Sequence, residues 1–300
     1  MPSDFLQRRR CSKSGSSGTR SCVLRRYTDF SSPIETLARL SFQRFFRFFR
    51  KLSGMTGTAR EAAGEFWHIY QLPVITVPTN RPCIRKQLPD AVFPTAAEKW
   101  AAIADVIQKW NRTGRPVLVG TRSVVASERL AEQLTARGLT FNLLNAVRHR
   151  EEARIVAAAG EPGRITIATN MAGRSTDIKL GHSVAELGGL HVMATERHES
   201  GRIDRQLFGR SARLGDPGSA QAFMSAEDEL IERFVPGPMR KRLLGALSKK
   251  APGSARMAKV AIAHAQGAAQ RLAYKQRRNV LQMDTWLEEA LSFSGPGSED

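Results

Sequence analysis

Cysteine is scarce in this 300-residue sequence, which has three, at positions 11, 22 and 83. Their spacing matches no metal-binding motif and cannot form a disulfide framework, so structural zinc is not expected and a reducing compartment is favoured. No apolar run approaches the roughly 18–20 residues that a membrane-spanning helix needs, and no secretory signal pattern stands at the start. The sequence therefore predicts a cytoplasmic protein without a signal peptide or a transmembrane helix.

Acidic residues are also in short supply, with 28 Asp and Glu against 46 Lys and Arg and a formal charge of +18. The deficit is uneven along the chain. Residues 1–52 carry 12 basic and 3 acidic groups, and residues 235–283 carry 11 basic and none acidic, whereas residues 53–234 are nearly neutral with 23 and 20. Basic ends of this kind suit nucleic acid, an anionic membrane surface or an acidic partner, and composition does not choose among them.

The amino-terminal region divides into an arm and a helix. Residues 1–33 are rich in Arg, Ser and Gly, which is typical of a disordered segment. A helical period over Leu37–Leu52 places five phenylalanines on one side and arginines on the other. Two interpretations follow: a cationic amphipathic helix at a membrane surface, or, as the favoured one, a helix packed on a sheet with its arginines in solvent.

Between residues 116 and 223 short apolar segments recur at intervals of about 24–30 residues, the length of a βα unit. They predict a parallel sheet covered by helices on both faces, that is, a doubly wound α/β domain that binds ligands at the carboxyl ends of its strands. The expected strands are Val117–Val119, Phe141–Leu144, Ile165–Ala168, His191–Ala194 and Ala220–Phe223.

Further elements flank this sheet. We expect helices at Glu61–Tyr70, Ala96–Trp110 and Ser123–Arg137 and a strand at Val74–Val77. Ser225 with Asp228 indicates a capping box for a helix that ends near Phe234, and residues 255–291 read as one long basic helix.

Three polar clusters fall at expected carboxyl ends of strands, within residues 168–177, 195–200 and 206–213. The first is a small-residue loop with one cation and one carboxylate, which suits phosphate and ribose contacts. The third holds two arginines three residues apart, expected on one helical face, which suits a triphosphate. Each cluster alone is more often an ordinary loop or solvated helix; their occurrence at one edge of one sheet favours a nucleotide site.

The order of these motifs resembles the SecA family, the ATP-driven motors of bacterial preprotein translocation. The resemblance covers about residues 34–284. It rests on Gly-Met-Thr-Gly-Thr-Ala at 54–59, Pro-Thr-Asn-Arg-Pro at 78–82, Pro-Val-Leu-Val-Gly-Thr at 116–121, Thr-Asn-Met-Ala-Gly-Arg-x-Thr-Asp-Ile at 169–178, Gly-Gly-Leu-His at 188–191, Thr-Glu-Arg-His-Glu-Ser at 195–200 and Gln-Leu-x-Gly-Arg-Ser-x-Arg at 206–213.

The resemblance implies a helicase-like engine of superfamily 2, in which ATP lies between two RecA-like domains. Asp177, with Gly173 and Arg174 beside it, would contact the nucleotide.

Arg210 and Arg213 would be the arginine-finger candidates, Gln206 would help couple them to the cleft, and Thr56, Gly57 and Thr58 would match a coupling motif at the end of the first motor domain. The resemblance implies the Sec translocon and a preprotein as partners, with peripheral association at the inner membrane. An amino-terminal motor half or full-length SecA would complete the ATP site, and the basic ends of the chain suit an anionic membrane surface. No metal ligand is assigned.

Departures from the family pattern limit the expected activity. The sequence contains no Gly-x-x-x-x-Gly-Lys-Ser/Thr phosphate loop and no Asp-Glu-Ala-Asp-like magnesium site. ATP or ADP with Mg²⁺ is therefore expected only if a partner chain supplies the loop, and the chain alone is not expected to turn over ATP, whether it is a split motor half or a gene fragment. The family's usual Gly is replaced by Ser175 and Ala212, its usual Arg by Phe208, and the segment after Gly181 is short.

The expected domains are a basic arm at 1–33, the tail of a first motor domain at 34–77, a second RecA-like domain at 78–234, a helical scaffold segment at 235–291 and a disordered tail at 292–300. Two functions compete with that of a translocation component. One is a non-catalytic basic adaptor for an anionic membrane or the translocon. The other is a helicase-like nucleic-acid binder, which is disfavoured because no aromatic stacking platform is interleaved with the basic stretches.

Overall fold

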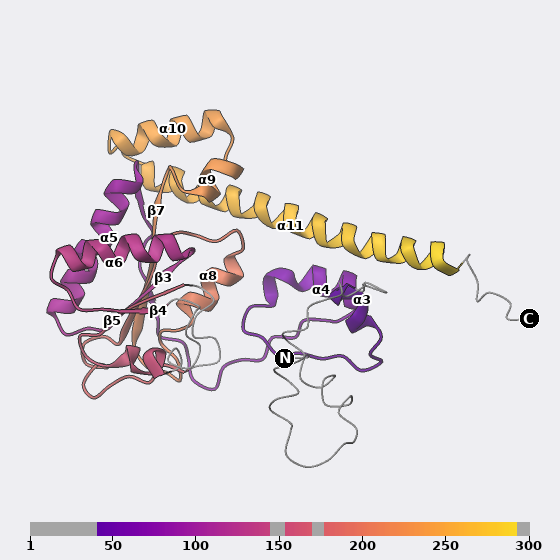
Figure 1. Cartoon of the computed structure of the whole chain (residues 1–300), viewed down its shortest axis with the longest axis horizontal. Helices are drawn as coiled ribbons and strands as arrows, with labels where there is room; N and C mark the ends of the chain where they lie inside the picture. Colours follow the sequence, from indigo (N-terminus) through magenta and orange to yellow (C-terminus); the bar gives the residue numbers. More distant parts are fainter. Residues whose placement is uncertain (1–40, 145–153, 170–176, 293–300) are drawn as a thin grey trace, which may run out of the picture. The chain divides into compact units, whose positions relative to one another are not determined.

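A parallel β-sheet organises the chain. The computed structural model describes residues 41–144, 154–169 and 177–292 (Figure 1). The strands are β1 (Lys86–Gln87), β2 (Ala91–Phe93), β3 (Val117–Thr121), β4 (Asn142–Leu144), β5 (Ile165–Thr169), β6 (Leu190–Ala194) and β7 (Gly218–Ser225). Their order is β1-β7-β6-β3-β5-β4, β2 also pairs with β7, and every pairing is parallel. The doubly wound α/β class and all five strands expected between 116 and 223 are confirmed.

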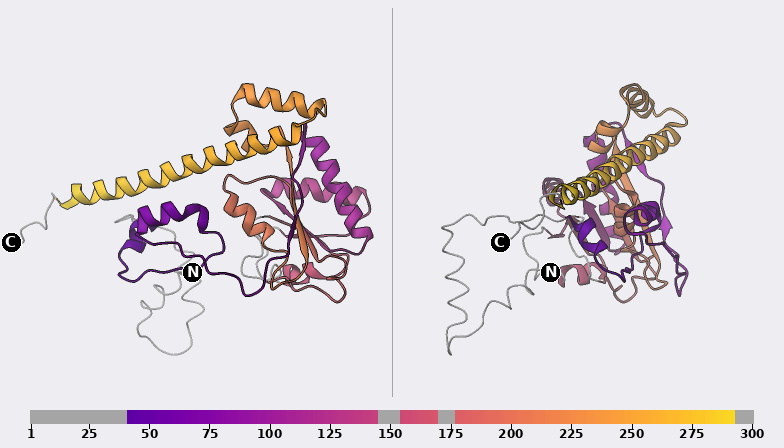
Figure 2. Two further views of the ribbon diagram at one scale, coloured as in Figure 1. Left: turned by 180° about the vertical axis from the view of Figure 1, so that it is seen from behind. Right: turned by 90° about the vertical axis from the view of Figure 1, so that its right-hand side faces the viewer.

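Helices connect the strands and pack on both faces of the sheet. The helices described are α3 (Phe42–Arg47), η1 (Arg60–Ala62), α4 (Ala63–Tyr70), α5 (Ala96–Arg112), α6 (Val124–Ala136), η2 (Ala158–Gly160), α8 (Gly201–Phe208), α9 (Glu229–Phe234), α10 (Gly237–Ser248) and α11 (Ser254–Ser292). The expected helices at 61–70, 96–110 and 123–137 are confirmed, as is the long carboxyl-terminal helix. Figure 2 shows α11 as one continuous helix with α10 beside its first turns.

The two faces of the sheet bury different cores because strand side chains alternate in direction. Val117 and Val119 of β3 point to the face that α5 and α6 cover, whereas Leu118 points to the face that α8 covers. Figure 1 shows α5 and α6 on one side of the strands and α8 on the other. A third cluster joins the end of β7 to α9, α10 and the first half of α11.

The capping of α9 differs from the expected capping box. The Ser225 hydroxyl donates to the Asp228 carboxylate at 2.6 Å instead of accepting from a backbone N–H, and the other oxygen of Asp228 accepts from the Ser225 N–H at 2.9 Å. The reason is the buried ammonium of Lys99, which donates to Asp228 at 2.5 Å. Asp228 stands at the N-cap position of α9 but makes no side-chain capping bond, because its buried carboxylate is taken up by Lys99 and Ser225.

Two other expectations are wrong in the amino-terminal region. Residues 74–77, all of which the structure describes, form no strand, and the helix expected at 37–52 is limited to Phe42–Arg47 within the described part, since residues 48–52 are not helical. The phenylalanines are not buried on a sheet: Phe42 remains 78% exposed and Phe48 63%. Helix α3 packs beside α4 and α11, and rings of three phenylalanines contact one another. The favoured interpretation, a helix covered by the sheet, is therefore not realised.

A buried polar cluster lies at the amino end of β6, on the side of the sheet opposite the carboxyl ends of the strands. His191 is fully buried, and its Nδ1 lies 2.7 Å from the Ser219 hydroxyl. Arg115, which can only donate, donates to the same hydroxyl at 2.8 Å, and the other ring nitrogen of His191, Nε2, is buried without a hydrogen-bond partner among the residues described. A charged His191 ring would leave its Nε2–H buried without an acceptor, which favours the neutral ring. Burial, and secondarily the charge of Arg115, lowers its pKa to about 3.

This burial predicts a pH-dependent stability. Above pH 6.5 His191 is neutral in both states, but as the pH falls towards 3 only the unfolded chain binds the proton, so the native state loses stability. We expect His191→Gln, whose amide can hydrogen-bond to Ser219 but does not titrate in this range, to remove this pH dependence of stability. The free energy of unfolding in urea should then fall less steeply than in the parent, by about 1 kcal/mol per pH unit between pH 6 and 5. Parallel pH profiles for the two proteins would contradict the assignment.

Candidate functional site

The carboxyl edge of the sheet gathers the polar clusters. Since β3, β5 and β6 are neighbours and parallel, the segments that follow them start at one edge. Arg122 follows β3, residues 195–200 follow β6, and Asp177 stands eight residues after the end of β5. Gly173 and Arg174, the other expected nucleotide contacts, lie outside the described residues.

Two of the expected site residues contact each other. Arg213 Nη1 donates to Asp177 Oδ1 at 2.7 Å, and Arg213 Nε donates to the Gly209 carbonyl at 2.9 Å. The side chains remain 37% and 47% exposed. An ion pair this exposed contributes little to stability, about 0–1 kcal/mol, so its partners can exchange it for a ligand at small cost.

The coupling motif contacts the same helix. Gln206 of α8 donates from Nε2 to the Thr58 hydroxyl at 3.2 Å, and that hydroxyl lies 3.3 Å from the Thr56 hydroxyl. One residue earlier on α8, Arg205 pairs with Glu61 at 2.7 Å. Two distant motifs, near residues 56 and 206, are thereby joined by a direct side-chain contact.

The arginines do not share a helical face as expected. Helix α8 ends at Phe208 and Gly209 is its C-cap, so Arg210 and Arg213 lie in the turn that follows. Ala212 and Leu214 in this turn adopt left-handed conformations, with φ of 54° and 53°. The turn ends the helix and returns the chain to β7.

Phe208 is part of the core rather than of the cleft. It is 3% exposed, and the Arg197 guanidinium lies over its ring at 5.2 Å, a cation–π contact. Arg197 also donates twice to Asp90, with Nη2 at 2.7 Å from both carboxylate oxygens. The family's usual Arg at 208 is thus replaced by a residue that packs the sheet.

Asp204 is the residue that sequence reasoning missed. It is 1% exposed and accepts from the His198 N–H at 2.9 Å, from Arg197 at 3.3 Å and from Gln266 of α11 at 2.8 Å. His198 Nδ1 lies 2.6 Å from the same carboxylate, and Gln266 also donates to the His198 carbonyl at 2.8 Å. His198 is therefore a structural residue. No local pattern links Gln266 to a residue 62 positions earlier, so only the fold reveals this junction.

Glu196, another carboxylate at this edge, has a raised pKa. Glu196 follows β6 and lies between Arg122, at 4.0 Å, and the buried Lys99–Asp228 pair. Burial, chiefly, raises the pKa of Glu196, while the nearby Lys99 and Arg122 oppose the shift. Among the residues described, no group of three or more His, Cys, Asp and Glu side chains could hold a metal ion.

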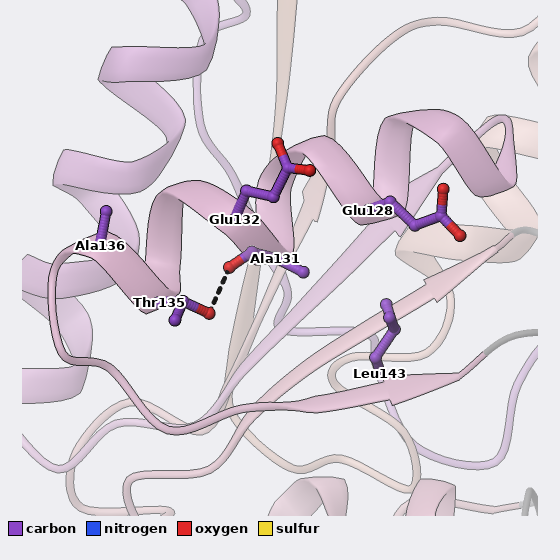
Figure 3. A pocket seen from close by; sticks show the side chains of 6 residues that line it. All are labelled: Glu128, Ala131, Glu132, Thr135, Ala136 and Leu143. Atoms are coloured by element: carbon purple, nitrogen blue, oxygen red, sulfur yellow. Dashed lines mark hydrogen bonds between the residues drawn. The ribbon is translucent and has the colours of Figure 1, made fainter.

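A shallow hollow outside this edge is a weak candidate. It lies between α6 and the edge strand β4 (Figure 3), and its lining consists of Glu128, Ala131, Glu132, Thr135, Ala136 and Leu143. The Thr135 hydroxyl donates within the helix to the Ala131 carbonyl at 2.8 Å. None of the lining residues belongs to an expected motif. In the part of the chain that the structure describes, no helix is long and apolar enough to cross a membrane.

The fold and the carboxyl edge together define a RecA-like domain of the nucleotide-binding type. Family models agree with this class: the SecA P-loop domain matches residues 82–185 and 181–249, and the SecA DEAD-like domain matches residues 24–67. The chain belongs to the SecA family. The two P-loop-domain matches meet at 181–185, where the sequence showed a shortened segment.

Curated relatives cover most of the chain. It is 47% identical to protein translocase subunit SecA 2 of Chlorobium chlorochromatii over 89% of its length, and 47% identical to SecA 2 of Bordetella avium over 90%. It is 48% identical over 85% of its length to protein translocase subunit SecA of Nitratidesulfovibrio vulgaris. The chain spans 40%, 41% and 30% of these relatives, respectively.

Solved structures similar to this chain include E. coli DEAD-box protein SrmB, 21% identical, with a TM-score of 0.39 over 50% of this chain and 82% of that one. Yeast DEAD-box splicing factor Prp28 is 18% identical, with a TM-score of 0.42 over 65% of this chain and 39% of that one. The fold class itself rests on the observed strand order.

The turn that carries the arginines makes a stability prediction. A left-handed backbone costs a residue with a Cβ about 1–2 kcal/mol, and glycine avoids this cost while gaining freedom in the unfolded chain. Ala212→Gly should therefore raise the free energy of unfolding by about 0.5–1 kcal/mol, measured by urea denaturation. Ala101→Gly, in the middle of α5, is the matched control and should lower it by about 1 kcal/mol. Equal destabilisation by both changes would refute the strain at Ala212.

Proposed function

We propose that this chain provides the second RecA-like half of a nucleotide cleft in a SecA-type protein translocation motor. The single observation that carries the proposal is the hydrogen bond between Gln206 and Thr58 on the helix that leads to the Arg213–Asp177 pair. This contact joins the candidate coupling motif to α8, and α8 leads to the turn with the candidate arginines and their contact with Asp177, which supports a shared site. Membership of the SecA family supports the same function.

The residues at the carboxyl edge have the chemistry to contact the phosphates and the ribose of ATP. Arg210 and Arg213 would donate to phosphate oxygens as charge moves onto them during transfer, and Asp177 would accept from the ribose or position a water. The half-exposed Arg213 would exchange its contact with Asp177 for one with the nucleotide. Any resulting movement of α8 would reach Thr58 through its hydrogen bond with Gln206.

The same residues do not form a site for Mg²⁺, since this sequence has neither a phosphate loop nor paired magnesium carboxylates. ATP supplies the transferable phosphoryl group, and a SecA segment that bears the phosphate loop would hold it together with Mg²⁺. A preprotein and the Sec translocon are the proposed partners, in keeping with the relatives' name of protein translocase subunit. We place the complex at the cytoplasmic face of the inner membrane.

The two competing functions, a basic adaptor for a membrane or the translocon and a nucleic-acid binder, remain predictions that rest on the charge distribution of the sequence. The exposed phenylalanines of α3 and the basic stretch at 235–283 agree with a membrane-binding adaptor, yet neither explains why residues 56–58 contact α8. The nucleotide half-cleft accounts for that contact and for the Arg213–Asp177 pair, so it is the function that the geometry favours.

The proposal predicts ATP turnover only in the presence of a complementing segment. The purified chain alone should hydrolyse no ATP above background, and addition of a SecA segment with the phosphate loop should produce turnover, measured by phosphate release. Arg210→Ala and Arg213→Ala should each reduce this turnover by about 10³-fold, the range known for arginine fingers.

Arg164→Ala provides the control, because Arg164 also forms an exposed pair with a carboxylate, Glu161 at 2.9 Å, but at the opposite edge of the sheet. It should leave turnover unchanged. Hydrolysis by the chain alone, or equal turnover by all three variants, would disprove the half-cleft function.

A further inference from the structure

The connector before β1 lies against the turn that carries the arginines. The connector is residues 78–85, and its side chains donate to three carbonyls within residues 211–215, the part of the turn that directly follows Arg210 and contains Arg213. Arg81 Nη1 donates to the Leu214 carbonyl at 3.2 Å, and Arg85 Nη1 donates to the Ser211 carbonyl at 3.4 Å. The Cys83 thiol is directed at the Ala212 carbonyl at 4.0 Å, a weak contact.

Side-chain packing reinforces these hydrogen bonds. A Cβ on Gly215 would stand 3.0 Å from Arg81 Cδ and 3.4 Å from Arg81 Cβ, so the stem of Arg81 lies over the bare glycine backbone. Gly215 has a φ of 87°, which glycine adopts without strain. The glycine therefore serves both the turn and its contact with the connector.

The turn needs such external support. Ala212 and Leu214 are left-handed at a cost that the surrounding structure must offset. The turn has hydrogen bonds of its own at its two ends, from Ser211 N–H to the Phe208 carbonyl at 3.1 Å and from Asp216 N–H to the Arg213 carbonyl at 2.9 Å, and the connector adds its bonds between them. The connector is itself fixed nearby, because β1 pairs with β7 in the register Lys86↔Ser219. The arginine side chains of the connector thus bridge a rigid strand pair to a strained turn.

We infer that Arg81 and Arg85 are positioning residues, which hold the turn at 211–215 and thereby set where Arg210 and Arg213 point. The effect on turnover rests on the proposed nucleotide function, whereas the effect on the turn does not. Arg81 and Arg85 act through backbone carbonyls, so their removal leaves both finger candidates in the sequence but lets the turn sample other conformations. The chain also runs through the connector from the coupling motif at 56–58 to β1, so the connector links the two along the sequence.

The experiment compares amide hydrogen exchange of the full chain with that of the double variant Arg81→Ala/Arg85→Ala. Loss of the two hydrogen bonds should accelerate exchange of peptides that cover 211–216 by about tenfold, with the midpoint of thermal unfolding nearly unchanged. The variant Arg81→Lys/Arg85→Lys keeps the charge and a donor at each position and should restore most of the protection. Lys86→Ala, which removes an exposed cation from the adjacent strand β1, should have no effect.

Turnover in the presence of the phosphate-loop segment gives the second readout. We expect kcat of the double alanine variant to fall by at least tenfold with KM little changed, and the lysine variant to recover it. Unchanged exchange at 211–216, or accelerated exchange with an unchanged kcat, would overturn the positioning role. If the parent chain shows no complemented turnover, the proposed function fails, but exchange at 211–216 still decides whether the connector holds the turn.

Discussion

The structure at the carboxyl edge depends on one buried carboxylate. Asp204, 1% exposed, accepts from the backbone of His198, from Arg197 and from Gln266, and so joins the segment after β6, helix α8 and helix α11 at one point. A carboxylate this buried is tolerable only when its lone pairs are satisfied, and breaking such a network typically costs about 3–5 kcal/mol. Because Asp204 stands in the first turn of α8, it fixes the start of the helix whose end leads into the arginine turn.

The other contacts at the carboxyl edge come after Asp204 in chain order. Gln206, two residues later, reaches Thr58; Phe208 ends the helix in the core; and the left-handed Ala212 turns the chain so that Arg213 meets Asp177. Strong, buried contacts thus hold the base of α8, while the exposed ion pair at its far end is weak. A nucleotide that bound here would therefore have to displace only the exposed Arg213–Asp177 ion pair, while the buried contacts of α8 stayed in place.

The sequence predicted the strands of the sheet well, but it predicted the segments around the sheet and their contacts poorly. Short apolar segments at βα spacing predicted all five strands between 116 and 223, because a strand that is buried on both faces is apolar along most of its length. The motif order also brought Gln206 and Thr58 into one proposed site. The helical face for Arg210 and Arg213 was wrong because Gly209 caps α8, and the strand at 74–77 was wrong because apolar alternation does not supply a pairing partner. Asp204 with Gln266 and the Arg81 and Arg85 contacts depend on long-range packing, which no local pattern encodes.

The central claim is that nucleotide binds against the carboxyl edge, beside Asp177 and the arginine turn. Hydrogen exchange of the chain mixed with a phosphate-loop-bearing SecA segment, with and without ADP, tests it most directly. The account predicts that ADP slows exchange in peptides covering 177–180 and 206–215, and leaves the opposite edge around Arg115 and Gly189 unchanged. Protection that is absent at 206–215, or that appears only at the opposite edge, would contradict it.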